Sequence, residues 1–398
     1  MLLNGIRIID LTRVVAGPCC TRTLADLGAE VIKIEPPNGD LWRRGVPKVG
    51  GIAIGYAQLN AGKEHLSIDL GQEAGRDLVR ELVREADVFV ENYRPGVTER
   101  LGLGYEAVRA EKADIIYCSI TGYGQEGPAA RRRAYAPIIH AELGLVDLNA
   151  RERGTDPLPE AVSHADFAVG AQAATGILAA LVHRLRTGEG QHVDVSMAET
   201  MLAVNEWTAV EVNGGLGDRI SPFRPGRAAL FRFPDGTWIQ VPGNPTTWIF
   251  GVARALGREE ELAARGWTDP SATQGREKEI RELIQTWAAD FPSREAFEEA
   301  LTRARIPLGE VKPLSGVIHE DWAQARQAFA EIALGEDTIH VPRSPFRLSS
   351  GSAGPRSGAA RRGADNRRIL RSLLGKTDAE LDRLQAAGVL CSEDDATP

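Results

Sequence analysis

Residues 7–35 read RIIDLTRVVAGPCCTRTLADLGAEVIKIE and contain two apolar runs on either side of a helical stretch. The pattern predicts a strand over 7–12, a helix over 19–28 and a strand over 31–35, which together form a right-handed βαβ unit. The same alternation continues with strands predicted over 65–70, 87–93, 114–120 and 192–197, and helices over 73–86 and 95–110. We therefore predict an α/β fold, with a Rossmann-like, doubly wound parallel sheet covered by helices on both faces.

The carboxyl ends of the strands are where such sheets bind their ligands. After the first predicted strand, residues 13–18 read RVVAGP and lack the GxGxxG pattern whose glycines let a backbone approach a pyrophosphate. Segments 92–96 and 121–124 follow later strands of the same sheet. We therefore expect this edge of the sheet to bind a ligand other than NAD or FAD.

Beyond the first strands, the sequence predicts two domains. Residues 1–214 form the large domain, which also holds helices predicted over 131–150, around Asp166 and over 197–212. Residues 215–228 are rich in Gly, Pro and Arg, and we interpret them as a linker.

A smaller α+β domain is predicted over 229–325. Its elements are strands over 229–233 and 238–242 with a turn at Pro234-Asp235-Gly236, and helices over 247–256, 276–290 and 293–304. Residues 326–398 are interpreted as a surface linker followed by a helical tail that packs back on the large domain.

Composition limits the classes of function. The chain has 398 residues and a net charge of −8 without a long acidic run, so we expect a globular protein with no nucleic-acid partner. The four cysteines lack a paired spacing, which favours the cytoplasm. We expect no membrane span and no signal peptide, since no apolar run approaches about 18 residues. The seven histidines are scattered, so no metal site is predicted.

One carboxylate, Asp166, starts a long helix that is rich in small side chains, which let another backbone approach closely. Because first-turn N–H groups and the helix dipole favour a charged carboxylate, we expect Asp166 to be ionised, as a nucleophile must be. The structural alternative is that Ser163 and Asp166 form a capping box, which would only fix the start of the helix.

Segments along nearly the whole chain resemble the class III coenzyme A transferases, or CaiB/BaiF family, whose relatives include formyl-CoA transferase and α-methylacyl-CoA racemase. These segments are IDLTRVVAGP, LADLGAEVIKIEPPNGD, LNAGKEHLSIDL, ADVFVENYRPG, YCSITGYGQEGP, the Asp166 segment with TGEGQHVDVSMAE, and LLGKTDAEL with AAGVL. The resemblance implies that the C-terminal tail completes the large domain, and that two chains form a homodimer of interlocked rings.

The resemblance also implies a mechanism. Asp166 aligns with the catalytic aspartate, which attacks the thioester of a donor acyl-CoA and passes through an anhydride and an aspartyl-CoA thioester. The substrates would be an acyl-CoA and a free carboxylic acid, and no cofactor would be bound permanently.

Residues for CoA follow from the same resemblance: Val14, Val15, Ala16, Asn92, Tyr93, Arg100, Arg133 and Tyr135. Structural alternatives are a plain core role for Val14 and Val15 and a solvated charge for Arg100. Gly243 could act as a lid over Asp166 or could belong to an ordinary hairpin.

The chain departs from the family pattern at several positions. Gly71 stands where a phosphate-binding lysine often follows, and Val15 and Ala136 replace a glutamine and a glutamate of formyl-CoA transferase. Residues 241–245 lack the run of glycines found in that enzyme. These differences argue against oxalate as the acceptor.

Two other functions stay open. A racemase needs two groups on opposite faces of the α-carbon; its relatives carry a Gly-His-Asp motif where residues 134–136 read AYA, so His140 or His164 would have to be recruited to the substrate. The second alternative is a non-catalytic acyl-CoA-binding protein.

The acyl group is suggested by arginines. Such cations could hold the distal carboxylate of a short dicarboxylate such as succinate, malate or mesaconate, although arginines on a solvated face look identical in a sequence. The candidates are Arg43, Arg44, Arg131, Arg132 and Arg133.

Overall fold

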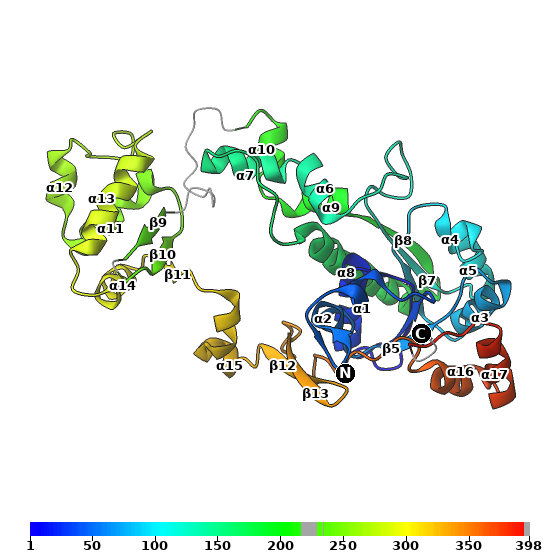
Figure 1. Ribbon diagram of the computed structural model, residues 1–398. Helices are drawn as coiled ribbons and strands as arrows, with labels where there is room; N and C mark the ends of the chain where they lie inside the picture. The colour runs from blue at the N-terminus through cyan, green and yellow to red at the C-terminus, as the bar shows by residue number, and fades with distance from the viewer. Residues whose placement is uncertain (216–228, 234, 394–398) are drawn as a thin grey trace. The chain divides into compact units, whose positions relative to one another are not determined.

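The computed structural model describes residues 1–215, 229–233 and 235–393, and it divides into two compact units (Figure 1). The large unit contains Met1–Gly144, Pro159–Asn205 and Ile318–Pro398. The small unit contains Leu145–Leu158 and Glu206–Val317. Of the predicted linker 215–228, all but Gly215 lies outside the described residues.

The described part of the large unit is built on a six-stranded parallel sheet in the order β5-β2-β1-β6-β7-β8. The strands are β1 (Arg7–Asp10), β2 (Glu30–Glu35), β5 (Glu64–Ser67), β6 (Val88–Glu91), β7 (Ile116–Thr121) and β8 (Gln191–Ser196). The chain moves outward from β1 to β5, then returns to the other side of β1 with β6. This order is that of a doubly wound Rossmann-like sheet, so the predicted α/β class is confirmed.

Helices cover both faces of this sheet, as predicted (Figure 1). The helices of the large unit are α1 (Ala16–Asp26), α2 (Ile54–Asn60), α3 (Glu73–Arg84), α4 (Val97–Arg100), α5 (Tyr105–Glu111), α6 (Ala136–Glu142), α8 (His164–Thr187), α9 (Met197–Val204), α15 (Asp321–Ala325), α16 (Asn366–Leu374) and α17 (Asp378–Ala386), of which α15 lies away from the sheet. Shorter pieces are η1 (Leu41–Arg44), β3 (Lys48–Val49), β4 (Ile52–Ala53) and η3 (Leu314–His319).

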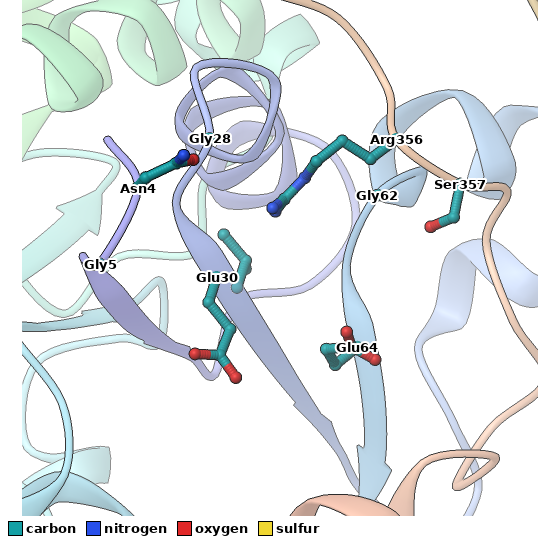
Figure 2. A pocket seen from close by; sticks show the side chains of 9 residues that line it. Asn4, Gly5, Gly28, Glu30, Gly62, Glu64, Arg356 and Ser357 are labelled. Carbon is teal, nitrogen blue, oxygen red and sulfur yellow. The ribbon is translucent and has the colours of Figure 1, made fainter. Parts of the chain in front are cut away.

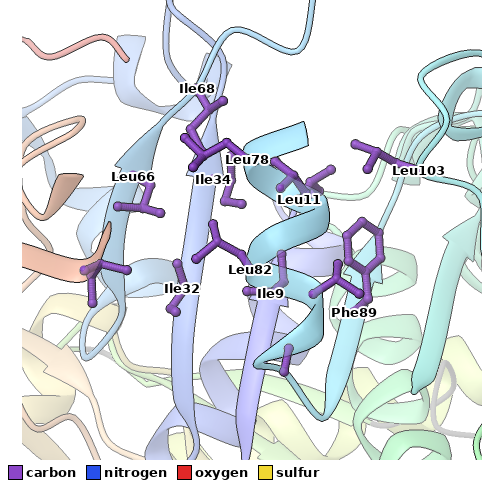
Figure 3. Close-up of a cluster of buried hydrophobic side chains, with 14 of the residues drawn as sticks. Ile9, Leu11, Ile32, Ile34, Leu66, Ile68, Leu78, Leu82, Phe89 and Leu103 are labelled. Atoms are coloured by element: carbon purple, nitrogen blue, oxygen red, sulfur yellow. The ribbon is translucent and has the colours of Figure 1, made fainter. Parts of the chain in front are cut away.

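The main core lies between the sheet and α3. Figure 3 shows Leu78 and Leu82 of α3 against Ile9, Ile32 and Phe89 from three neighbouring strands, all of them buried. Alternate residues of β1 point the other way, and Asp10 meets α1 there. Since both faces of the strands are covered, their sequences are continuous apolar runs, and this made the sheet predictable.

The opposite face is covered by α1 and α8, which pack against each other. Among the described helices, α8 alone is long and apolar enough by length and composition to cross a membrane. A core helix passes the same test, and the buried residues of α8 pack on α1, β7 and β8.

The C-terminal tail packs on the large unit, as predicted. Ile369 and Leu370 of α16 and Leu381 of α17 are buried in the main core. Asn366 accepts a hydrogen bond from the N–H of Ser67 at 2.9 Å, and the N–H of Cys391 donates to the Ser67 carbonyl at 3.0 Å. The tail therefore also covers the free edge of β5.

Three predicted helices are broken in the structure. The helix predicted over 131–150 is replaced by α6 and α7 (Leu145–Arg153), because Gly144 between them has a φ of 78°. The helix predicted over 95–110 is α4 and α5, separated at Gly102 with a φ of 64°. The helix predicted over 197–212 is α9 and α10 (Thr208–Val212), with an extended residue, Asn205, after α9. A positive φ at glycine ends a right-handed helix.

A hairpin of β12 (Phe329–Leu334) and β13 (Asp337–Pro342) occupies part of the predicted surface linker. Gly335 in its two-residue turn has a φ of 68°. Ile332, Leu334 and Val341 are buried in a cluster with residues of β4 and α2. This segment is therefore part of the large unit and not a linker.

The small unit has an antiparallel sheet in the order β11-β10-β9 and its own apolar core. Its elements besides α7 and α10 are β9 (Ala229–Arg232), β10 (Trp238–Val241), α11 (Pro245–Leu256), α12 (Glu259–Ala264), α13 (Glu277–Ala289), α14 (Arg294–Arg303) and β11 (Gly309–Glu310). Residues 145–158 and 206–214 belong to this unit and not to the large one, and the unit ends at Val317, where we expected 325.

Candidate functional site

The sheet reverses its order between β1 and β6, where the connections leave on opposite faces and open a crevice at the carboxyl ends of the strands. A pocket of about 420 Å³ lies there. Most of its lining comes from the ends of β1, β6 and β7 and the segments that follow them, which are residues 13–16, 92–95, 97, 120–122, 130 and 132–135. Leu41, Asp166 and Met197 complete the lining. The pocket therefore occupies the position at which doubly wound sheets bind their ligands.

The turn after β1 is strained at Val14, whose φ is 68°, an unfavourable conformation for a β-branched residue. Its N–H donates to both carboxylate oxygens of Asp40, at 3.1 and 3.2 Å. Asp40 forms a buried ion pair with Lys33 at 3.1 Å, and the Lys33 ammonium donates to the Thr12 carbonyl at 2.8 Å. A buried charge pair thus holds the turn that exposes Val14 and Val15 to the pocket.

A second buried pair fixes the start of α1. The Lys63 ammonium lies 3.1 Å from Asp10 and 2.7 Å from the hydroxyl of Thr21 on α1. Asp10 also accepts from the N–H of Thr12 at 2.8 Å. Burial lowers the pKa of Lys63 to about 8, and the neighbouring Asp10 opposes this shift. These bonds connect β1, its turn and α1 into one rigid support.

Asp166 lies where the first turns of three helices meet. It is the third residue of α8 and is 9% exposed. The backbone N–H groups of Ala136 and Ala16, the first residues of α6 and α1, face its carboxylate and act to lower its pKa. Each of these N–H groups lacks a partner within its own helix and stands at the positive end of a helix dipole.

The pKa of Asp166 is higher than its position in the first turn of a helix alone would give. Burial raises its pKa to about 6, although the N–H groups of Ala136 and Ala16 act in the opposite direction. These N–H groups belong to α6 and α1 and not, as we expected, to the first turn of α8, and removal of the carboxylate from water outweighs them. At neutral pH about ten carboxylates are still ionised for each one protonated, so the group can attack an electrophile.

The capping box that was the structural alternative for Asp166 does not form. Ser163 is the N-cap of α8, yet its side chain makes no capping hydrogen bond. Close packing with α1 supports the helix start instead, because a Cβ added at Gly170 would lie 2.8 Å from the carbonyl oxygen of Ala16. The small side chains thus bring the two helices together, as the sequence predicts.

His140 does not line the pocket, contrary to its expected contact with a substrate. It is buried on α6, and its Nε2 accepts a hydrogen bond from the N–H of Ala165 at 3.0 Å. The ring proton must therefore be on Nδ1, and the nitrogen that could take a proton from a substrate is occupied. The other candidate base, His164, is exposed and also outside the pocket lining.

Most of the residues assigned to CoA come together in the pocket. They are Val14, Val15, Ala16, Asn92, Tyr93, Arg133 and Tyr135. Asn92 joins the two sides of the crevice, because its side chain accepts from the N–H of Arg13 and donates to the Arg13 carbonyl, both at 2.9 Å. Arg100 is exposed on α4 and does not line the pocket, and Gly243 lies in the small unit before α11.

Sequence reasoning missed two cations of the pocket. The Arg13 guanidinium lies over the ring of Tyr93 at 4.5 Å from the centroid, and Arg94 follows on the same segment. Both come directly after a predicted strand, at positions that meet at the carboxyl edge of the sheet. That placement was the available signal for them.

The proposed carboxylate-binding arginines differ in their surroundings. Arg43 is already held by Glu35 through two hydrogen bonds, at 2.6 and 2.7 Å, and stacks on Tyr56, so it is a structural residue. Arg132 lines the pocket but pairs with Glu142. Arg133 lines the pocket and is exposed, whereas Arg44 and Arg131 lie outside the lining.

A second hollow, of about 390 Å³, lies at the opposite ends of the strands, near the start of β2 and β5 (Figure 2). Its charged groups already have partners: Glu30 pairs with Arg7 at 2.9 Å, Glu64 with Arg368, and Arg356 donates to the Ala29 carbonyl at 2.6 Å. It contains no buried nucleophile among the described residues, so the switch-point pocket is the candidate site. No metal-binding group of three His, Cys, Asp or Glu occurs in the part of the chain that the structure describes.

Comparisons with known proteins point to one family. Succinyl-CoA:glutarate CoA-transferase of Mus musculus is 33% identical, with 98% of this chain and 90% of that protein aligned. The β subunit of succinyl-CoA–L-malate CoA-transferase of Chloroflexus aurantiacus is 28% identical, with 98% of each covered. A solved CaiB/BaiF family structure from Brucella suis matches with a TM-score of 0.80 and 30% identity, covering 93% of this chain and 99% of the other. The model of CoA-transferase family III matches residues 3–366, which include Asp166 and every strand of the parallel sheet, and the chain therefore belongs to that family.

Proposed function

We propose that this CoA-transferase moves coenzyme A from succinyl-CoA to a second short dicarboxylic acid, with Asp166 as the nucleophile. The observation that carries the proposal is a buried carboxylate that faces the first N–H groups of two helices inside the switch-point pocket. The names of two relatives, which act on succinyl-CoA with malate or glutarate, support the class of acid.

The reaction begins when an Asp166 oxygen attacks the thioester carbonyl of the donor. The C–S bond breaks, giving a mixed anhydride and the CoA thiolate. The thiolate then attacks the aspartyl carbonyl, which releases the donor acid and leaves an aspartyl-CoA thioester. The acceptor carboxylate attacks that thioester to form a second anhydride, and the released thiolate attacks its acceptor carbonyl. The product is the new acyl-CoA, and the Asp166 carboxylate is restored.

The surroundings of Asp166 suit these steps. Negative charge moves between the carboxylate, the thiolate and the tetrahedral oxygens, and the N–H groups of Ala16 and Ala136 stabilise such charge without reorganisation. Burial raises the basicity of the carboxylate and excludes the water that would hydrolyse an anhydride.

The pocket offers the two kinds of surface that CoA requires. Val14, Val15 and Met197 supply apolar wall for the pantetheine arm, and Arg13 and Arg94 supply charge for phosphate oxygens. We assign the distal carboxylate of the acid to Arg133, which is exposed and has no ion-pair partner among the described residues. A panel of acceptors tests this assignment with propionyl-CoA as the donor, so that only the acceptor can carry a distal carboxylate: in Arg133→Met, turnover should fall for succinate, malate and glutarate but not for butyrate. An equal loss for all acids would contradict it.

We also propose that the enzyme is a homodimer, of the interlocked kind that the family resemblance implies. In support, α8 exposes apolar side chains along one face, with Phe167 39%, Val182 47% and Leu185 81% exposed. Exposed apolar side chains in such a row favour burial by a partner. Sedimentation should show dimer at every concentration, and an active monomer would contradict this.

No disulfide joins the cysteines of the described residues, which supports a cytoplasmic enzyme.

A racemase is disfavoured because the described residues of the pocket lining include no second base opposite Asp166. Hydroxylamine distinguishes the functions. In a transferase it converts the aspartyl-CoA thioester of Asp166 into a hydroxamate and free CoA, which mass spectrometry of the peptide detects. A racemase or a binding protein would leave Asp166 unmodified, and a racemase would instead exchange the α-proton for deuterium in heavy water.

A further inference from the structure

The first turn of α8 lacks a cap from its own sequence. A helix start normally receives hydrogen bonds from an N-cap side chain such as serine, and the Ser163 side chain makes none. The N–H of His164 bonds to the Val162 carbonyl at 2.9 Å, and the N–H of Phe167 to the Ser163 carbonyl at 3.2 Å. The N–H of Ala165, directly before Asp166, is satisfied by another helix through His140.

Helix α6 therefore contacts the start of α8 at two points one helical turn apart. The N–H of Ala136 faces the Asp166 carboxylate and acts to lower its pKa, and the Nε2 of His140 accepts from the N–H of Ala165 at 3.0 Å. The first contact lies at the side chain of the nucleophile, and the second is a hydrogen bond to the backbone next to it. Together they fix Asp166 relative to α6.

His140 makes this contact from a buried position. It is 1% exposed, and its Nδ1, which must carry the ring proton, has no hydrogen-bond partner. Buried polar atoms without partners are rare in folded proteins. The hydrogen bond from the N–H of Ala165 to Nε2 leaves Nδ1 of His140 in this state, so the role of the ring needs an explanation. A contact with substrate does not supply one, because His140 is absent from the pocket lining.

We propose that His140 is a positioning residue, which caps α8 from α6 and thereby directs the Asp166 carboxylate at the acyl-CoA. The inference rests on the proposed role of Asp166 as nucleophile. His140 itself touches neither substrate nor reacting atoms.

The proposal predicts a specific kinetic defect. Without the acceptor at His140, the first turn of α8 is free to fray, and Asp166 loses its alignment with the thioester carbonyl. A displacement of about 1 Å at a reacting group costs on the order of 100-fold in rate. CoA binding should persist, because the residues that line its path, such as Val14 and Asn92, belong to other elements. The loss should therefore appear in kcat, with KM for succinyl-CoA within about twofold.

Three variants, with a fourth as a replacement, test the proposal in the full-length enzyme. His140→Gln places an amide oxygen near the position of Nε2 and should keep most of the activity. His140→Leu has a similar volume without an acceptor and should lose about 10- to 100-fold in kcat. His164→Leu alters the neighbouring exposed ring, whose centroid is 5.8 Å from that of His140, and should behave like wild type. If His140→Leu does not fold, His140→Asn replaces it. Asparagine carries the same amide group as glutamine on a shorter side chain, so His140→Asn should also lose kcat.

Wild-type kcat in His140→Leu or His140→Asn would overturn the proposal. So would a loss of kcat in His140→Gln as large as that in His140→Leu, or a defect that appears in KM and not in kcat. Hydroxylamine trapping keeps this failure separate from failure of the proposed function. If wild-type enzyme yields no Asp166 hydroxamate, the nucleophile is wrong. If wild type yields it and all His140 variants yield it at the same rate, only the positioning role is wrong.

Discussion

Two helix starts in this protein share one sequence spacing and differ in outcome. Helix α17 begins with Thr377 and Glu380, which form a complete capping box: the N–H of Glu380 donates to the Thr377 hydroxyl, and the N–H of Thr377 to the Glu380 carboxylate at 2.7 Å. Helix α8 begins with Ser163 and Asp166 at the same spacing, and no box forms.

The two carboxylates are consequently in different chemical states. Glu380 is half-buried, and its hydrogen bonds with the side chain and backbone of Thr377 lower its pKa. Asp166 is buried, and burial raises its pKa to about 6. Glu380 caps its own helix, and its hydrogen bonds stabilise the charged carboxylate. Asp166 does not cap its own helix and faces the N–H groups of α1 and α6, so its carboxylate can act as a nucleophile. Position in a helix alone therefore does not define the role of such a residue.

The largest expected difference between the two starts is in catalysis. Asp166→Asn should lower kcat by about 1000-fold or more, because an amide cannot form the anhydride. The equivalent change at the other helix, Glu380→Gln, should leave kcat unchanged. Steady-state assays with succinyl-CoA measure both. If Asp166→Asn kept wild-type turnover, Asp166 would not be the nucleophile, and the two helix starts would not differ in catalysis.

Packing beneath α8 should come next in effect. Gly170→Ala adds a Cβ 2.8 Å from a backbone oxygen of α1, so α8 must move. We expect a loss of about 10- to 100-fold in kcat and a destabilisation of about 1–3 kcal/mol. The matched control is Gly176→Ala, whose Cβ meets only a Val193 methyl, at 2.9 Å, that can rotate away. If both variants behave alike in activity and thermal melting, close packing does not position Asp166.

The pH dependence should follow Asp166 and not Glu380. Since the attacking carboxylate must be ionised, the rate of hydroxamate formation should be level above pH 7 and fall about tenfold per unit well below its pKa of about 6. Ionisation also affects stability. The pKa of Asp166 in the folded protein exceeds its ordinary value of 3.8. The contribution of protonated Asp166 to the free energy of unfolding is therefore fully present below pH 3.8 and is lost as the pH rises through about 6.

The matching stability measurement uses Asp166→Asn. At pH 8 this variant should unfold at a higher temperature than wild type, by a free energy of at most about 3 kcal/mol. At pH 4 the advantage should have largely disappeared. An advantage that grows as pH falls would have the wrong sign and would contradict the burial argument.

The smallest effect is expected at the cap itself. Thr377→Ala removes the hydroxyl that accepts from Glu380 and should destabilise the protein by about 1 kcal/mol without changing kcat. The same change at α8, Ser163→Ala, should alter neither quantity, because that hydroxyl makes no capping bond. Equal destabilisation by the two changes would show that Ser163 does cap α8.

The sheet could be predicted because its signals are local, whereas the role of Asp166 as nucleophile came from the family resemblance and stays a prediction. Each central strand is covered on both faces and is an apolar run, and the small residues around Gly170 record the close approach of α1. The β12–β13 hairpin also had a local signal, since buried residues alternate around Gly335, but the surrounding polar sequence led to its interpretation as a linker.

The remaining features depend on contacts between residues of different elements. Arg43 resembled a free cation because its partner Glu35 lies on another element. The pKa of Asp166 depends on burial by three helices, and the cap of α8 comes from His140, 25 residues away. A single sequence contains no periodicity that records such contacts.

Oxygen transfer tests the central claim most directly. When succinate labelled with ¹⁸O in both carboxylates is the acceptor, its attack on the aspartyl-CoA thioester and the return of CoA should leave one labelled oxygen in the Asp166 carboxylate after a single turnover, and up to two after many. Mass spectrometry of the peptide that contains residue 166 should detect this label after turnover, and labelled water in place of labelled succinate should give none. Label that is absent from Asp166, found on another residue, or taken from water would contradict the anhydride mechanism.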